Sequence, residues 1–230
     1  MSDQPMRSHR AIAIAIVIAG VLISASVFVA VSGAAKTVTN TATTTVTSLD
    51  SPLSTSAVGA GLELSLSLNA SQLSPGQEVE FNVSLVNTLS SPDNITADPG
   101  AWTGLPQVSL GPCGDLNEPF GFLIAQGFYT AGNASSATPL GLYSPGTYNC
   151  PAILDYSYYV FQPESYLMSS CESGGFCNQA PAMSSSAYGG SWPSSSGSQG
   201  TFTPFKHGVY TVVAATEWGQ VDVLHFTVGS

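Results

Sequence analysis

Two neighbouring stretches alternate apolar and polar residues at every second position, and this pattern limits the fold more than any other feature. The first is LELSLSLN at 62–69 and the second is EVEFNVSLVN at 78–87, with a turn at Pro75-Gly76 between them. A period of two residues is typical of strands that bury one face, and Pro-Gly is a strong turn signal. The predicted inward positions are Leu62, Leu64, Leu66, Leu68, Val79, Phe81, Val83 and Leu85.

Strands are also predicted further along the chain. FGFLIAQGFYT at 120–130, AILDYSYYVFQ at 152–162 and GTFTPF at 200–205 are short apolar runs bounded by turn residues, which is typical of strands. SSSAYGGSWPSSSGSQG, 184–200, is so rich in Ser and Gly that we expect a loop there, acting as a spacer or carrying binding residues. No segment after the first 35 residues has a helical period. The fold class expected is all-β, a β-sandwich with long loops.

The last stretch, HGVYTVVAATEWGQVDVLHFTV at 207–228, is predicted to be a closing hairpin that turns at Trp218-Gly219. Its G-x-Y-x-V-x-A pattern, together with LSPGQEVEFNVSLVNT near the start of the domain, resembles the closing and opening strands of immunoglobulin-like surface domains. The resemblance implies an immunoglobulin-like sandwich, with the hydroxyl of Tyr210 bonded to the backbone in a tyrosine corner. A Cys-Trp-Cys core signature is absent from the sequence, so kinship with antibody domains is not implied.

The N-terminal part is of a different kind. Residues 11–35 form a run of 25 residues without a charge, long enough for a helix to span the ~30 Å hydrocarbon layer. Arg7 and Arg10 precede it, which predicts a cytoplasmic N-terminus and an extracellular C-terminal domain in a single-pass cell-membrane protein. The expected organisation is a cytoplasmic segment at 1–10, a transmembrane signal-anchor at 11–35, a Thr-rich stalk at 36–61 and the sandwich at 62–230.

Two alternatives to an uncleaved anchor remain open. Ser32 and Ala34 have a spacing that would suit cleavage by a signal peptidase, although the apolar run exceeds the usual 7–15 residues of a signal peptide. RAIA, Arg10 to Ala13, resembles the processing site of archaeal prepilins. That resemblance implies cleavage after Ala11 and a filament built on the apolar helix, so a pilin-like subunit is the alternative function.

The charge distribution excludes one class of partner. The net charge is −10, and only one of the four Lys and Arg residues follows residue 36. A protein that binds nucleic acid replaces the counterions of phosphates with Lys and Arg, so no nucleic-acid partner is expected. The acidic, Ser- and Thr-rich composition fits an extracellular domain.

Four cysteines and four sequons suit that location. An even number of cysteines in an oxidising compartment predicts disulfides, and CESGGFC favours pairing Cys171 with Cys177 and Cys113 with Cys150. A zinc site is the rejected alternative, because the spacing does not match. The predicted glycosylation sites are Asn69, Asn82, Asn94 and Asn133.

Little in the sequence indicates catalysis. The three histidines, His9, His207 and His225, are separate in the sequence, and no G-x-S-x-G motif occurs. Glu217 and Asp222 flank the final turn and are expected to be solvated. The late Cys-His-Met arrangement of cupredoxin copper sites is absent too. We therefore expect no enzyme, no cofactor and no metal.

Aromatic residues provide the remaining candidates, because they dominate binding surfaces. YSYYVFQPESY at 156–166 could be a recognition surface or a core strand with a loop, and the core alternative is favoured. The candidate recognition residues are Tyr156, Tyr158, Tyr159, Tyr166, Tyr188 and Trp192. The expected function is binding, adhesion or envelope structure at the cell surface, with a protein or glycan partner.

Overall fold

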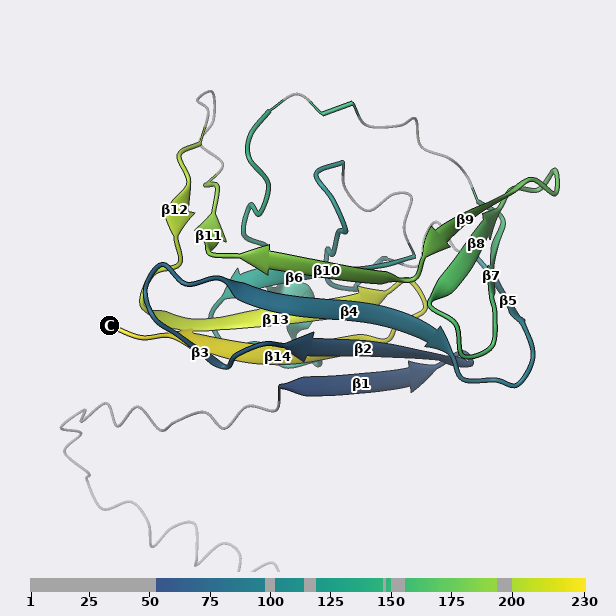
Figure 1. Ribbon diagram of the computed structural model, residues 1–230, viewed down its shortest axis with the longest axis horizontal. Helices are drawn as coiled ribbons and strands as arrows, with labels where there is room; N and C mark the ends of the chain where they lie inside the picture. Colours follow the sequence, from purple (N-terminus) through teal and green to yellow (C-terminus); the bar gives the residue numbers. More distant parts are fainter. Residues whose placement is uncertain (1–52, 98–101, 114–118, 147, 150–155, 194–199) are drawn as a thin grey trace, which may run out of the picture. The chain divides into compact units, whose positions relative to one another are not determined.

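The computed structural model describes residues 53–97, 102–113, 119–146, 148–149, 156–193 and 200–230, and these fold as strands apart from one short 3-10 helix. Two four-stranded sheets stack face to face, and a third four-stranded sheet lies beyond one end of them (Figure 1). We call these the first sheet, the second sheet and the side sheet. The prediction of an all-β, sandwich-like domain is confirmed.

The first sheet has the strand order β1-β2-β4-β10, with every pair antiparallel. Its strands are β1 (Ser54–Gly59), β2 (Leu62–Leu68), β4 (Val79–Asn87) and β10 (Met183–Tyr188). The alternating residues of β2 and β4 point inward as predicted, and all eight are at most 6% exposed. Phe81 meets Phe122 of the opposite sheet edge-on, with ring centroids 4.6 Å apart.

The second sheet has the order β3-β14-β13-β6. Its strands are β3 (Gln72–Leu73), β6 (Phe120–Gln126), β13 (Gly208–Thr216) and β14 (Val221–Val228). The chain turns between β13 and β14 at 217–219, which confirms the closing hairpin. β6 and β13 are buried on both faces, because Ala134 of the short 3-10 helix η1 (Ala134–Ser136) and Val108 from a loop cover the side away from the first sheet. This explains their continuous apolar runs.

The predicted Pro75-Gly76 turn is present, and Gly76 has φ +82°, a backbone conformation that glycine adopts without strain. The short strand β3 precedes that turn and was not expected. It leaves the first sheet and pairs in parallel with the end of β14 in the second sheet. The segment between the two predicted strands therefore ties the sheets together.

The side sheet has the order β5-β7-β8-β9, all antiparallel. Its strands are β5 (Asp93–Thr96), β7 (Tyr158–Phe161), β8 (Leu167–Cys171) and β9 (Cys177–Pro181). Side-chain hydrogen bonds help to fasten it to the sandwich. The Asn87 side chain donates from Nδ2 to the Phe161 carbonyl at 3.0 Å, and Trp218 Nε1 donates to the Thr96 carbonyl at 3.1 Å.

Two predicted boundaries were wrong. The stalk was expected to reach residue 61, but residues 54–59 form β1 and pair with β2 along their whole length. The stretch 184–200 was expected to be a loop, but 184–188 belong to β10 and 190–191 to β11 (Gly190–Ser191), which pairs with β12 (Thr203–Pro204). Serine-rich strands lack hydrophobic contrast, and here backbone pairing to a neighbouring strand overrides weak local propensity.

The predicted transmembrane helix, cleavage sites and most of the stalk lie outside the described residues. Within the described ranges, no helix is long and apolar enough to cross a membrane.

Candidate functional site

The six candidate recognition residues do not form one surface. Tyr156, Tyr158, Tyr159 and Tyr166 belong to the side sheet and its turns, whereas Tyr188 and Trp192 lie at the other end of β10, near β11 and β12 (Figure 1). Tyr159 is 4% exposed and packs edge-on against Trp218. The favoured alternative for 156–166, a core strand followed by a loop, is what the structure contains.

Tyr188 and Trp192 instead lie beside a separate hollow, which we call the aromatic pocket. Its volume is about 420 Å³, within the range of small-ligand sites. Trp192 lines it, and Tyr188 packs behind it against Tyr143, with ring centroids 6.3 Å apart. The lining residues are Pro112, Gly141, Tyr143, Ser144, Pro145, Gly146, Tyr148, Trp192, Pro193 and Gly200.

Two close backbone approaches build the pocket wall. The Trp192 amide donates to the Gly141 carbonyl at 2.6 Å, so the segment after β6 is pinned to the end of β11. A Cβ at position 141 would lie 2.4 Å from the Trp192 carbonyl oxygen, and one at position 200 would lie 2.5 Å from that of Pro193. Only glycine fits at these two contacts.

Aromatic contacts fix the side chains of the pocket. Trp192 packs against Phe202 with ring centroids 5.4 Å apart. The Tyr148 hydroxyl donates to the Ser144 carbonyl, which closes the neighbouring turn. Burial raises the pKa of the Tyr143 hydroxyl above its usual range. This hydroxyl is buried beside Tyr188.

Among the described residues, the pocket lining has no charged side chain. Tyr and Trp rings offer flat apolar faces with a polar edge, and the Ser and Gly backbone supplies hydrogen-bonding groups. This combination can hold an uncharged ligand that has both apolar faces and hydroxyl groups.

A second site, which is polar, lies at the turn of the closing hairpin. The acids there were expected to be solvated, and this prediction was wrong. Asp222 and Glu217 are 4% and 8% exposed. Thr55 Oγ1 donates to Asp222 Oδ1 at 3.4 Å, while Oδ2 has no hydrogen-bond partner among the described residues. Burial raises the pKa of Asp222 to about 6. The surroundings of this carboxyl therefore favour its protonated form.

The neighbouring side chains connect this carboxyl to β1. Gln220 Nε2 donates to the Gly59 carbonyl at 2.6 Å, and the Thr216 hydroxyl bonds to Gln220 Oε1. Thr55 and Gly59 both belong to β1. The polar cluster therefore fastens β1 to the end of the hairpin, which is a structural role.

The histidines are apart from the aromatic pocket and from the acids. His225 Nε2 contacts the Tyr129 carbonyl at 2.8 Å, and its ring stacks on Phe128 with centroids 4.1 Å apart. His207 is exposed, and His9 lies outside the described residues. Within the described ranges, no three His, Cys, Asp or Glu side chains are grouped to hold a metal.

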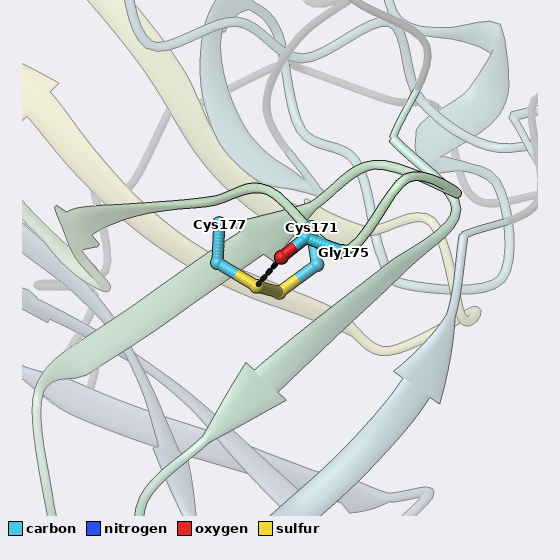
Figure 2. Close-up of a disulfide and its surroundings, with 3 residues drawn as sticks. All are labelled: Cys171, Gly175 and Cys177. Carbon is cyan, nitrogen blue, oxygen red and sulfur yellow. Dashed lines mark hydrogen bonds between the residues drawn. A yellow bond between two sulfur atoms is a disulfide. The ribbon is translucent and has the colours of Figure 1, made fainter.

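The disulfide Cys171–Cys177 joins β8 to β9, as predicted (Figure 2). The dashed contact in Figure 2 joins Cys177 Sγ and the Gly175 carbonyl at 4.0 Å; we read it as close packing, because a disulfide sulfur has no proton to donate. Cys113 is also disulfide-bonded, and Cys150 lies outside the described residues.

All four sequon asparagines are exposed: Asn69, Asn82, Asn94 and Asn133. Asn82 lies on the outer face of β4, and the Oδ1 of Asn69 accepts a bond from the Glu80 amide at 2.9 Å. The exposure makes glycosylation sterically feasible, and the modification itself stays a prediction.

Comparison with known proteins adds no family. No protein-family model matches the chain, and a search of curated proteins finds no significant match. The aromatic pocket was only partly foreseen, through Tyr188 and Trp192. Tyr143 and Tyr148 come from a Pro- and Gly-rich segment with no alternating pattern, so no signal in the sequence placed them beside Trp192.

Proposed function

We propose that this chain is a cell-surface protein that holds an immunoglobulin-like sandwich outside the membrane on an N-terminal helix, for adhesion. The aromatic pocket is the observation that carries this proposal, and its ligand class is a neutral saccharide. Sugar rings present apolar C–H faces to aromatic side chains and hydroxyls to backbone groups. The domain has no excess of basic residues that would attract an acidic glycan.

The strand pairing supports the immunoglobulin-like assignment. β2, β4 and β10 take the places of strands A, B and E, while β6, β13 and β14 take those of C, F and G. Among the described residues, no strand takes the place of D beside β10. The Tyr210 hydroxyl donates to the Lys206 carbonyl at 2.9 Å, which is the contact of a tyrosine corner.

A glycan array tests the adhesive function. The full-length chain in a non-ionic detergent should bind a subset of neutral glycans, and Trp192→Ala should weaken that binding at least tenfold by removing one stacking face. Phe176→Ala, which truncates an aromatic residue that is 65% exposed on the β8–β9 turn, is the matched control. Equal binding by wild type and Trp192→Ala, or no binding to any neutral glycan, would refute the saccharide site.

The membrane anchor is tested separately on the native protein. Resistance to extraction by alkaline carbonate together with an intact N-terminal sequence would support the anchor. A chain that starts near residue 35 would point to a cleaved signal peptide, and a chain that starts at Ile12 would favour the pilin-like alternative.

A further inference from the structure

The two outer strands of the first sheet, β1 and β10, present six-residue edges that no described strand pairs with. Sheet edges carry unpaired backbone groups, and proteins block them with charge, proline, bulges or a covering segment. β1 reads STSAVG and β10 reads MSSSAY. Neither strand contains a charged residue or a proline.

Several other edges carry such protection. Leu140 and Ser109 bond to the outer backbone groups of β6. β3 has only two residues, β5 begins with Asp93, and β9 ends with Pro181. The contrast sets the two edges of the first sheet apart.

The backbone of β10 has free hydrogen-bonding groups. The Leu85 amide donates to the Ala182 carbonyl, so residues 182, 184 and 186 bond toward β4. Residues 183, 185 and 187 therefore direct their N–H and C=O groups away from the sheet. No described residue bonds to these groups. By the same alternation, residues 54, 56 and 58 of β1 direct theirs outward at the opposite edge.

The outer face of the first sheet also places an apolar residue at each edge. Val58 on β1 is 69% exposed and Met183 on β10 is 47% exposed. They are the two exposed large hydrophobic residues among the strands of this sheet, and both point to the solvent side. No described strand lies beyond either edge to cover these two side chains.

We propose that β10 of one copy pairs antiparallel with β1 of a second copy, in the register that sets Met183 opposite Val58. In this register Ser185 faces Ser56 and Ala187 faces Ser54, so all six outward-bonding residues meet. β1 and β10 run in opposite directions within one copy. A second copy in the same orientation therefore continues the antiparallel sheet.

Two-fold pairings match less well. In a full-length pairing of β10 with β10, Met183 would face Ala187, and in a pairing of β1 with β1, Val58 would face Ser54. Only the β10–β1 pairing joins the two apolar residues while using both strands completely. Such a head-to-tail interface leaves β1 unpaired at one end of the assembly and β10 unpaired at the other, so further copies can add at both ends. The twist of about 20–25° per strand turns successive copies into a helical array.

Substitutions at the edges test the interface. The full-length chain in a non-ionic detergent should self-associate with rising concentration in sedimentation velocity. Val58→Lys and Met183→Lys should each abolish this association, because each places a charge at the strand pairing between copies. Both positions are exposed in the single copy, so the substitutions should leave its fold intact. Phe176→Lys, an exposed apolar residue on the side-sheet turn, should not. A wild-type chain that stays monomeric, or association that survives both edge substitutions, would overturn the proposal.

Cysteine cross-linking tests the register and the partner edge. Ala57→Cys and Ser184→Cys occupy a directly opposed pair without backbone bonds, the close type of antiparallel pair. Within one copy these positions are three strand spacings apart, roughly 14 Å, beyond the reach of a disulfide. Mixing the two single variants should give a cross-linked dimer that neither forms alone. A dimer from either variant alone, or no dimer in the mixture, would reject this pairing and its register.

Discussion

The sandwich and the side sheet obtain their stability in different ways. The sandwich has strands of up to nine residues, and β2 and β4 bury every second side chain. The side sheet has strands of four or five residues, with Tyr159, Phe161 and Met168 as its large buried side chains and a disulfide across its last hairpin. One region is therefore held by apolar burial, and the other by a few anchors to its neighbour.

The largest effect should come from the centre of the sandwich. Phe81 is 1% exposed and contacts Phe122 across the two sheets. Phe81→Ala should lower the free energy of unfolding by about 3–5 kcal/mol, through lost burial and the cavity left behind. Urea unfolding followed by circular dichroism measures this. Glu80→Ala, one position away on the outer face, should change it little. If both substitutions cost the same, burial would not be what holds the sandwich.

The next effect concerns the link between the two regions. Trp218 lies edge-on to Tyr159 and Phe161 at 5.7 and 5.9 Å, and its Nε1 bonds to Thr96. Trp218→Ala should cost about 2–3 kcal/mol, from lost packing and a lost hydrogen bond. Hydrogen exchange should show β5 and β7 losing protection before the sandwich does. Trp218→Phe keeps a ring and should recover part of the loss. Equal loss of protection in both regions would mean that they unfold as one unit.

These two positions also show what a sequence can predict. Phe81 lies in a strand whose polar residues contrast with its apolar ones, so alternation placed it in the core. Asp222 has the same parity in β14 as Leu224, Phe226 and Val228, which are buried. The alternation therefore held a signal for its burial, but a charged residue beside a turn suggested solvent.

Other elements had no readable pattern. β10 has Met, Ser and Ala on its outer face and two Ser and a Tyr on its inner face, so its sequence has little contrast and only its pairing with β4 defines it as a strand. The aromatic pocket joins segments that are about 50 residues apart in the sequence, Tyr143 and Trp192 among them. Such contacts depend on where loops cross, and glycine at positions 141 and 200 becomes meaningful only once the approaching carbonyls are known.

Within the side sheet, the disulfide should add a local stabilisation of its last hairpin. Cys171 and Cys177 are six residues apart, and closing so short a loop stabilises by about 2 kcal/mol in the chain-entropy account. The double variant Cys171→Ala, Cys177→Ala should increase hydrogen exchange in β8 and β9 and leave β2, β4 and β14 protected. A drop in the protection of the sandwich would show that the sandwich depends on the side sheet for its stability, rather than the side sheet on the sandwich.

The smallest effect is a pH dependence confined to the sandwich. The pKa of Asp222 is raised from its ordinary 3.8 to about 6 by burial, so the folded chain binds a proton more tightly than the unfolded chain. The resulting stabilisation is complete below pH 3.8 and is lost as the pH rises through 6.

Between pH 7.5 and 4, the free energy of unfolding should therefore rise by about 1–2 kcal/mol more in the wild type than in Asp222→Asn, whose amide does not titrate. Glu80→Gln, which removes an exposed acid from the outer face, controls for the general decrease in charge repulsion. The local opening of β8 and β9 should be the same in the wild type and in Asp222→Asn at each pH, because Asp222 contacts β1 and not the side sheet. Parallel pH profiles for the wild type and Asp222→Asn would mean that this carboxyl is solvated and that β1 is held without it.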